Sequence, residues 1–191
     1  MRMILTCLAA ATLVAGCSGD KTPQVAESGE PSTQTLAGSL GAAPGLKTFG
    51  TALKDTGIAT VFDGTAAYTV FAPTDDAFGK LGDTGKALMQ PEQKAALAEV
   101  LRDHVVPGYL TPQDIDGALA AAKGKPVKMA TMGKGSLTFA RSGEDITVTS
   151  DEGAVARFDG QPLLAGNGVA IPVDSILVAA PGNGVTTAPA R

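Results

Sequence analysis

Few residues of this chain have side chains suited to catalysis or metal binding, and their spacing does not bring them together. The chain holds one histidine, His104, and two cysteines, Cys7 and Cys17. His104 follows Leu97 and Leu101 on one helix face, so we expect a structural histidine near a helix end, where free carbonyls accept a ring N–H. A catalytic or zinc-binding histidine would need partners, and both cysteines lie at the extreme N-terminus.

Two acidic pairs are further candidates for chemistry. Asp75 and Asp76 are adjacent, and adjacent side chains diverge on a helix, so we expect them to stabilise the start of a helix that Thr74 caps. Asp114 and Asp116 have the spacing of the first two ligands of a calcium loop, but the third ligand and the final glutamate are missing. The sequence therefore predicts no enzyme, no cofactor and no metal site.

Composition limits the partners of the chain. Nineteen acidic residues face fifteen basic ones, for a formal net charge of -4. With no excess of cations to neutralise phosphates, nucleic acid is not an expected partner. Hydrophobic residues make up 44% and charged residues 18% of the chain, as in a globular protein with a normal core.

The N-terminus has the pattern of an export signal. Arg2 precedes an apolar run that is shorter and less apolar than a membrane-spanning helix, and small residues follow. The sequence Val14-Ala15-Gly16-Cys17 resembles the bacterial lipobox. That resemblance implies a signal peptide over residues 1–16 and acylation of Cys17, which would anchor the chain to a membrane of the bacterial cell envelope. Ser18 after the cysteine favours the outer over the inner membrane, while an ordinary thiol at Cys17 in a simple signal peptide is the alternative.

Polar segments flank a single domain. Residues 17–35 are poor in apolar side chains, so we expect a disordered tether, and residues 179–191 predict a loose tail. The intervening residues 36–178 suit one hydrophobic core.

Within that domain, helical patterns come first and alternating patterns later. The expected helices are those around Leu46–Thr56, after Thr74, from Pro91 to Pro107, and from Thr111 to Gly124. The expected strands are Tyr68–Phe71, short runs around Val127, Leu137, Ile146 and Val155, and the closing strands Gly168–Ile171 and Ser175–Val178. Asn167 and Gly168 predict a turn, because both tolerate positive φ. This order predicts an α+β domain.

Three segments resemble the signatures of the fasciclin (FAS1) family, in that family's order. They are Tyr68–Phe78 (YTVFAPTDDAF), Leu101–Gly108 (LRDHVVPG) and Asn167–Leu177 (NGVAIPVDSIL). The resemblance implies a seven-stranded β-wedge or sandwich with helices packed on one side. It also implies structural roles for the motif residues Thr69, Phe71, Pro73, Thr74, Phe78, His104, Asn167, Gly168 and Asp174.

Two residues depart from the family pattern. Asp103 precedes the histidine where many members carry tyrosine. Pro172 interrupts the closing strand, which predicts that this strand lies at an edge or contains a bulge.

The resemblance implies a non-enzymatic module for cell adhesion or for contact with other proteins. We therefore expect an envelope-anchored binding module that contacts the membrane through its lipid, and contacts an unidentified envelope or extracellular protein or matrix component through its domain. A carrier or sensor of a small apolar ligand is the alternative, and a hydrolase with an unrecognised site is a third.

Overall fold

The computed structural model describes residues 33–143 and 145–177. The predicted signal peptide, Cys17, most of the tether, Val178 and the 179–191 tail lie outside these residues. Within the described part, no helix combines the length and apolar character that crossing a membrane requires. The last residues of the predicted tether belong to the fold, because Thr35 caps the first helix and the Gln34 carbonyl accepts a hydrogen bond from Gly166.

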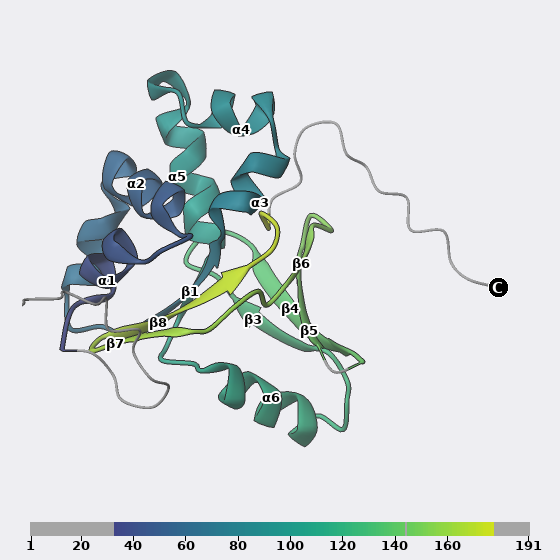
Figure 1. Cartoon of the computed structure of the whole chain (residues 1–191). Coiled ribbons are helices and arrows are strands. Elements are labelled where there is room, and N and C mark those ends of the chain that lie inside the picture. Colours follow the sequence, from purple (N-terminus) through teal and green to yellow (C-terminus); the bar gives the residue numbers. More distant parts are fainter. Residues whose placement is uncertain (1–32, 144, 178–191) are drawn as a thin grey trace, which may run out of the picture.

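Five of the six described α-helices form one group, and the sixth lies apart on the other side of the sheets (Figure 1). Local signals set several boundaries: Gly57 ends α2 with φ of 80°, Thr74 accepts a hydrogen bond at the start of α3, and Thr111 and Asp114 form a capping box on α6. The helices are α1 (Leu36–Ala42), α2 (Lys47–Thr56), α3 (Asp75–Lys80), α4 (Asp83–Leu88), α5 (Lys94–Asp103) and α6 (Pro112–Ala121), with 3-10 helices at Ile58–Asp63 and Pro91–Gln93.

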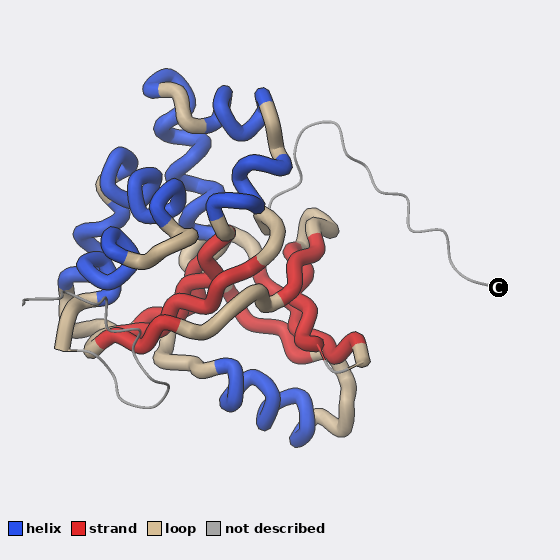
Figure 2. Tube along the Cα trace, viewed as in Figure 1, coloured by secondary structure: helices blue, strands red, loops and turns tan. Residues whose placement is uncertain are grey.

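The strands form two four-stranded sheets between these helical parts (Figure 2). Sheet A has the order β2-β1-β8-β7, in which β1 and β8 are parallel and the other pairs antiparallel. Sheet B is an antiparallel meander with the order β3-β4-β5-β6. The strands are β1 (Tyr68–Pro73), β2 (Val105–Pro107), β3 (Val127–Ala130), β4 (Ser136–Ser142), β5 (Asp145–Ser150), β6 (Val155–Arg157), β7 (Leu163–Ala165) and β8 (Gly168–Val173).

Sheet A separates two hydrophobic clusters. Val70 and Ala72 of β1 face the cluster formed with helices α1, α2 and α5. Phe71 points the opposite way into a second cluster, shared with sheet B and α6, where its ring centroid lies 5.1 Å from that of Phe139. The central strands β1 and β8 are therefore buried on both faces, as expected of a parallel pair.

The α+β fold predicted from the sequence is confirmed, although several of its elements differ in detail. The described residues form eight strands where seven were predicted: β2 and β7, each three residues long, were not predicted, and the predicted strand Ser175–Val178 is not formed in its described part. Helix α6 also packs through Ile115 and Leu119 into the second cluster, away from the other helices.

The predicted helix from Pro91 to Pro107 was wrong at its C-terminal end. Helix α5 ends at Asp103, and Val105–Pro107 forms strand β2 instead. The β-branched residues Val105 and Val106 satisfy their backbone groups by antiparallel pairing with β1. Long-range pairing therefore overrides the helical spacing of Val105.

The edge or bulge predicted at Pro172 is confirmed only locally: β8 is a central strand, but its pairing with β7 has ended where Pro172 lies. Pro172 lies within β8, which pairs with β1 as far as Val173. The Val173 carbonyl accepts a hydrogen bond from Thr74 on the β1 side, so Pro172 faces the other side. There, pairing with β7 ends at Ala170 and the Pro172 carbonyl accepts a bond from Asp159 at 2.9 Å. The missing N–H of proline therefore interrupts no ladder.

The predicted closing strand Ser175–Val178 is not a strand in its described part, Ser175–Leu177. Ile176 and Leu177 are nevertheless buried, one in each hydrophobic cluster. The apolar side chains of this segment are therefore explained by burial in the core and not by pairing with another strand.

Candidate functional site

The three motif segments lie side by side in sheet A. The Phe71 amide of β1 donates to the His104 carbonyl at 2.8 Å, and β8 pairs with β1 along its full length. The end of α5 therefore meets both motif strands, although more than sixty residues separate His104 from Gly168 in the sequence. The motif side chains lie at this junction or near its ends.

His104 is fully buried, and both of its ring nitrogens have partners. Nδ1 lies 2.8 Å from the Val100 carbonyl, and Nε2 lies 2.9 Å from the Leu177 amide nitrogen. Since the amide must donate to Nε2, the ring is the neutral tautomer with its proton on Nδ1. Burial lowers the pKa of His104 to about 4, against the opposing effects of the Val100 carbonyl and the neighbouring Asp103 charge.

Asn167 joins three backbone positions that are distant in sequence. Its side-chain oxygen accepts from the Leu36 amide at 2.8 Å, and its side-chain nitrogen donates to the carbonyls of Phe62 and Gly64 at 2.6 and 2.7 Å. This one side chain therefore connects the start of α1, the end of the first 3-10 helix and the start of β8.

The turn predicted at Asn167-Gly168 lies one residue earlier, at Gly166-Asn167 between β7 and β8, and the predicted positive φ was wrong. Neither Asn167 nor Gly168 is among the described residues with positive φ. A Cβ atom at Gly168 would instead overlap the Tyr68 carbonyl oxygen and lie 2.7 Å from the Leu36 side chain. Glycine is required here because β1 and α1 approach the backbone closely.

The Thr69 side chain binds the loop after β2, and the Asp174 side chain binds the last residue of β6. The Thr69 hydroxyl donates to the Gly108 carbonyl and accepts from the Leu110 amide, both at 2.8 Å. The Asp174 carboxylate accepts from the Arg157 amide at 2.8 Å. Each side chain thereby satisfies backbone groups of a segment that is distant in sequence.

The strand-to-helix turn after β1 uses the remaining motif residues. Pro73 ends β1, the Thr74 hydroxyl accepts from the Ala77 amide at 3.2 Å, and Phe78 packs into the first cluster. Asp75 accepts from the Thr48 amide at 2.7 Å. Burial alone would raise the pKa of Asp75, but the hydrogen bonds from Thr48 lower it below its usual value.

The motif side chains therefore serve the fold, since each polar one is bonded to backbone groups of another segment or caps a helix. Across residues 33–143 and 145–177, no group of three or more His, Cys, Asp or Glu residues could hold a metal ion. The junction binds α1, α5, β1 and β8 together.

A groove beside the end of α5 is a different kind of site. It has a volume of about 490 Å³ and lies between the end of α5, the β3–β4 turn and the β5–β6 turn. Leu177 contributes to its floor. The charged lining residues are Glu99, Arg102, Asp103, Lys134, Asp151 and Glu152.

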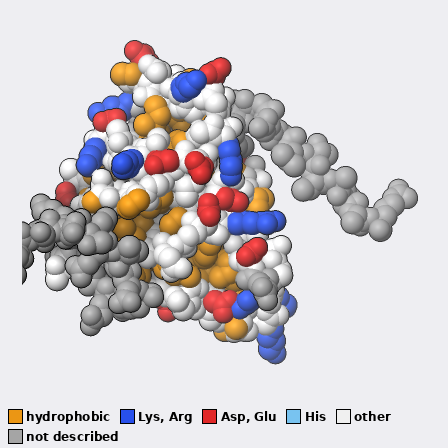
Figure 3. All heavy atoms as spheres, in the orientation of Figure 1, with side chains coloured by type: hydrophobic (Ala, Val, Ile, Leu, Met, Phe, Trp, Pro, Cys, Tyr) orange, Lys and Arg blue, Asp and Glu red, His pale blue; other side chains and the backbone are white. Residues whose placement is uncertain are grey.

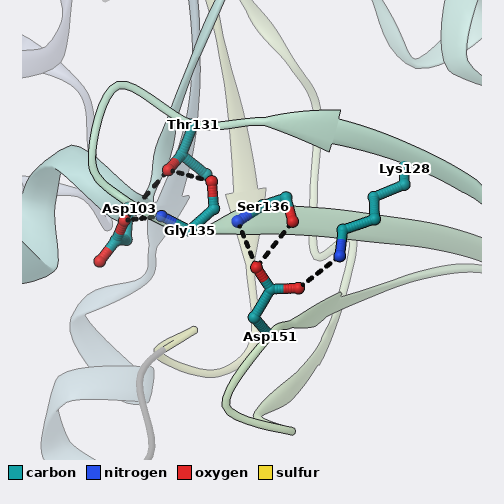
Figure 4. A network of polar contacts seen from close by, with 6 residues as sticks. All are labelled: Asp103, Lys128, Thr131, Gly135, Ser136 and Asp151. Atoms are coloured by element: carbon teal, nitrogen blue, oxygen red, sulfur yellow. Dashed lines mark hydrogen bonds and ion pairs between the residues drawn. The ribbon is translucent and has the colours of Figure 1, made fainter.

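Asp103 fixes the β3–β4 turn against α5 (Figure 4). Its Oδ1 atom lies 3.0 Å from the Thr131 hydroxyl and 3.3 Å from the Gly135 amide. A Cβ atom at Gly133 would lie 2.7 Å from the Asp103 carboxyl carbon, so only glycine lets the turn approach this closely. A glycine-containing turn therefore surrounds the Asp103 carboxylate.

Asp151 fixes the neighbouring turn in the same view. It accepts from the Ser136 amide and hydroxyl at 2.8 and 2.7 Å, and pairs with Lys128 at 2.9 Å (Figure 4). The bonds from Lys128 and Ser136 lower the pKa of the Asp151 carboxyl. The sequence did not predict this network, because its partners are separated by fifteen or more residues and carry no motif.

Two cations at the groove lack ion-pair partners within the described part of the chain. Arg102 and Lys134 are both exposed, and neither takes part in the salt bridges found there. Elsewhere on the described surface, the exposed large hydrophobic side chain is Val155, at 54%. On the face seen in Figure 3, hydrophobic side chains form separate patches among charges of both signs. Polar and charged contacts are thus what this surface offers.

Comparison with known proteins gives a consistent result. A family model described as the fasciclin domain matches residues 44–179. Protein sll1483 of Synechocystis sp. is 33% identical over 111 residues, which cover 56% of this chain and 60% of that protein. Among solved structures, a FAS1 domain pair from the insect cell adhesion molecule Fasciclin I superposes with a TM-score of 0.67 and 17% identity, over 78% of this chain and 52% of that chain.

The chain thus spans about three fifths of the curated relative and about half of the solved chain that it matches. The structural likeness concerns the fold, while the family model covers most of the residues between the predicted tether and tail. This chain therefore belongs to the fasciclin domain family.

Proposed function

We propose that this chain is a non-enzymatic binding module, held at a bacterial envelope membrane by lipid on Cys17 and contacting an envelope or extracellular protein or matrix component. Fasciclin domains are in general such binding modules. The observation that carries the proposal is that polar groups play different roles in two parts of the domain. The motif side chains are engaged within the fold, whereas the groove presents exposed charges.

The N-terminal sequence supports anchoring. A lipobox-like stretch ends at Cys17, and the residues from Ser18 to Ser32 are almost entirely polar or small. A tether of this length spans about 20–25 Å if it behaves as a flexible coil, which would hold the domain clear of the headgroups. Display at high local density lets weak individual contacts act together.

The groove is the contact surface that we propose. Arg102 and Lys134 can bind carboxylates of a partner, while Glu99 on the same wall can accept its cations. The turns that shape the groove are fixed by Asp103 and Asp151, so little ordering is needed on binding. The apolar side chains Met132, Leu137 and Leu177 in the same lining keep a carrier of a small apolar ligand as the alternative function.

Anchoring is tested by labelling living cells with radioactive palmitate. The wild-type protein is expected to take up label and to sediment with membranes, while a Cys17→Ser variant should do neither. A Cys7→Ser variant is the matched control and should be labelled like wild type. An unlabelled wild-type protein released after export would contradict the anchor.

The binding function is tested by comparing surface attachment and aggregation of cells with and without the gene. Loss of attachment in the deletion strain, restored by the wild-type protein but not by Cys17→Ser, is the expected result. Unchanged attachment of the deletion strain under several conditions, when wild-type cells do display the protein, would argue against the proposal.

A further inference from the structure

The last described segment of the chain is attached to helix α5 through the His104 ring. The Asp174 amide donates to the Arg157 carbonyl of β6, and the Asp174 carboxylate accepts from the Arg157 amide. Beyond Asp174, the Leu177 amide donates to His104 Nε2 at 2.9 Å. Ile176 and Leu177 are 8% and 1% exposed, and each enters a different hydrophobic cluster. Leu177 also forms part of the groove floor.

Only the neutral His104 ring, with its proton on Nδ1, can accept the hydrogen bond that holds this segment. Because Nδ1 already carries a proton for the Val100 carbonyl, a second proton would go to Nε2. Nε2 would then be a donor facing the Leu177 N–H, which is also a donor. The charged ring and the docked amide therefore exclude each other.

The surroundings of the ring offer little compensation for a charge. Phe49 of α2 faces it with ring centroids 6.3 Å apart, and the ring is fully buried. Asp103, adjacent on α5, is the charged group that acts on it, but one oxygen of this carboxylate is already bound to Thr131 and Gly135. Desolvation is the larger effect and lowers the pKa of His104 to about 4.

We propose that His104 is an acid-sensitive latch: its protonation releases Ser175–Leu177 from helix α5 and opens the groove floor while both sheets stay folded. The sheets do not depend on this contact, because β8 pairs with β1 up to Val173 and Asp174 is bonded to Arg157. Release exposes the ring to water, where its ordinary pKa lets it take up the proton. Opening is therefore coupled to the binding of one proton.

The test is amide hydrogen exchange by NMR on the folded, non-acylated domain that retains all residues from Thr33 onward. His104 is the one histidine of the chain, so its ring nitrogen signals need no assignment by mutation. At pH 7 we expect an unprotonated Nε2. Between pH 6 and pH 4 the protection factor of the Leu177 amide should fall about tenfold per pH unit, as one coupled proton requires. This exchange should be faster than that of Val169 and Ile171 in β8, and insensitive to low urea.

Two results would overturn the latch. Leu177 protection that does not change with pH shows that the ring does not control the segment. Protection equal to that of β8, with the same urea dependence, shows that the segment opens only when the whole domain unfolds. A His104→Gln variant, whose amide oxygen can accept from Leu177 without titrating, should abolish the pH slope. If it does not fold, the wild-type comparison of Leu177 with β8 decides alone.

Discussion

The motif junction and the groove meet at the end of α5 and use their polar groups differently. At the junction, His104 and Asn167 are bonded to backbone groups of segments far away in sequence, and Gly168 leaves room for a neighbouring strand. At the groove, the polar groups that are not fixing turns are exposed. Substitutions at the junction should therefore affect folding, and those at the groove should affect contacts with other molecules.

The largest effect is expected for Gly168→Ala. The new Cβ atom would overlap the Tyr68 carbonyl, so β1 and β8 could pair only after backbone movement. We expect the free energy of unfolding to fall by about 3 kcal/mol or more, measured by chemical denaturation. Gly79→Ala in α3 is the matched control, because its Cβ would meet nothing within 4 Å. Equal stability of the two variants would remove the close approach as the reason for this glycine.

Acidification should lower the free energy of unfolding, because His104 is buried in its neutral form. The folded pKa of His104 is about 4 and its unfolded value about 6.5, so its contribution to stability is complete above pH 6.5 and is lost as the pH falls towards 4. The loss amounts to about 3 kcal/mol at 1.4 kcal/mol per pH unit. Comparing wild type with His104→Gln isolates this contribution from that of the carboxylates. If the free energy of unfolding depended on pH in the same way for both proteins, burial would not be what lowers the pKa of His104.

Asn167→Ala should cost about 2 kcal/mol, since it leaves the Leu36 amide without its acceptor and removes two donors. Asn167→Asp keeps the acceptor for Leu36 but loses both donors, so an intermediate loss is expected. Thermal or chemical unfolding of the three proteins gives the order. An aspartate variant less stable than the alanine variant would indicate that charge repulsion at the two carbonyls dominates instead.

The smallest effect on stability is expected in the groove. An Arg102→Glu, Lys134→Glu double variant replaces two exposed side chains that lack ion-pair partners among the described residues, so its melting temperature should stay within about 3 °C of wild type. A large decrease would mean that these cations support the fold, and the contrast between junction and groove would be lost.

The sequence predicted those elements whose signals are local. The start of α3 was predicted from Thr74, and the start of α6 from Thr111 and Asp114. The end of α2 was predicted near Gly57. Alternation of apolar and polar residues predicted the strands of sheet B. Strands β2 and β7 were not predicted, because Val105 continues the helical spacing of α5 and Leu163–Ala165 shows no apolar–polar alternation. Their backbone groups are satisfied by segments distant in sequence. Short strands of this kind are defined by their partners.

The candidate site was predictable only in part. The family resemblance placed His104 and Asn167 as structural residues, but their partners Leu177, Leu36 and Phe62 follow from the fold. The groove was not predicted from the sequence, because Asp103 contacts Thr131 only when the fold brings the β3–β4 turn to the end of α5. The one signal in the sequence was Asp103, at a position where the family resemblance implies tyrosine. Its close contact with Gly133 is visible only in the structure.

The most direct test of the division between junction and groove is attachment of cells that display the Arg102→Glu, Lys134→Glu variant, with wild-type and deletion strains beside it. Display is matched by immunodetection on intact cells, and folding is checked by the melting temperature of the purified domain. We expect the variant to be displayed and folded like wild type but to attach as poorly as the deletion strain. Attachment equal to wild type would contradict the groove as the contact surface.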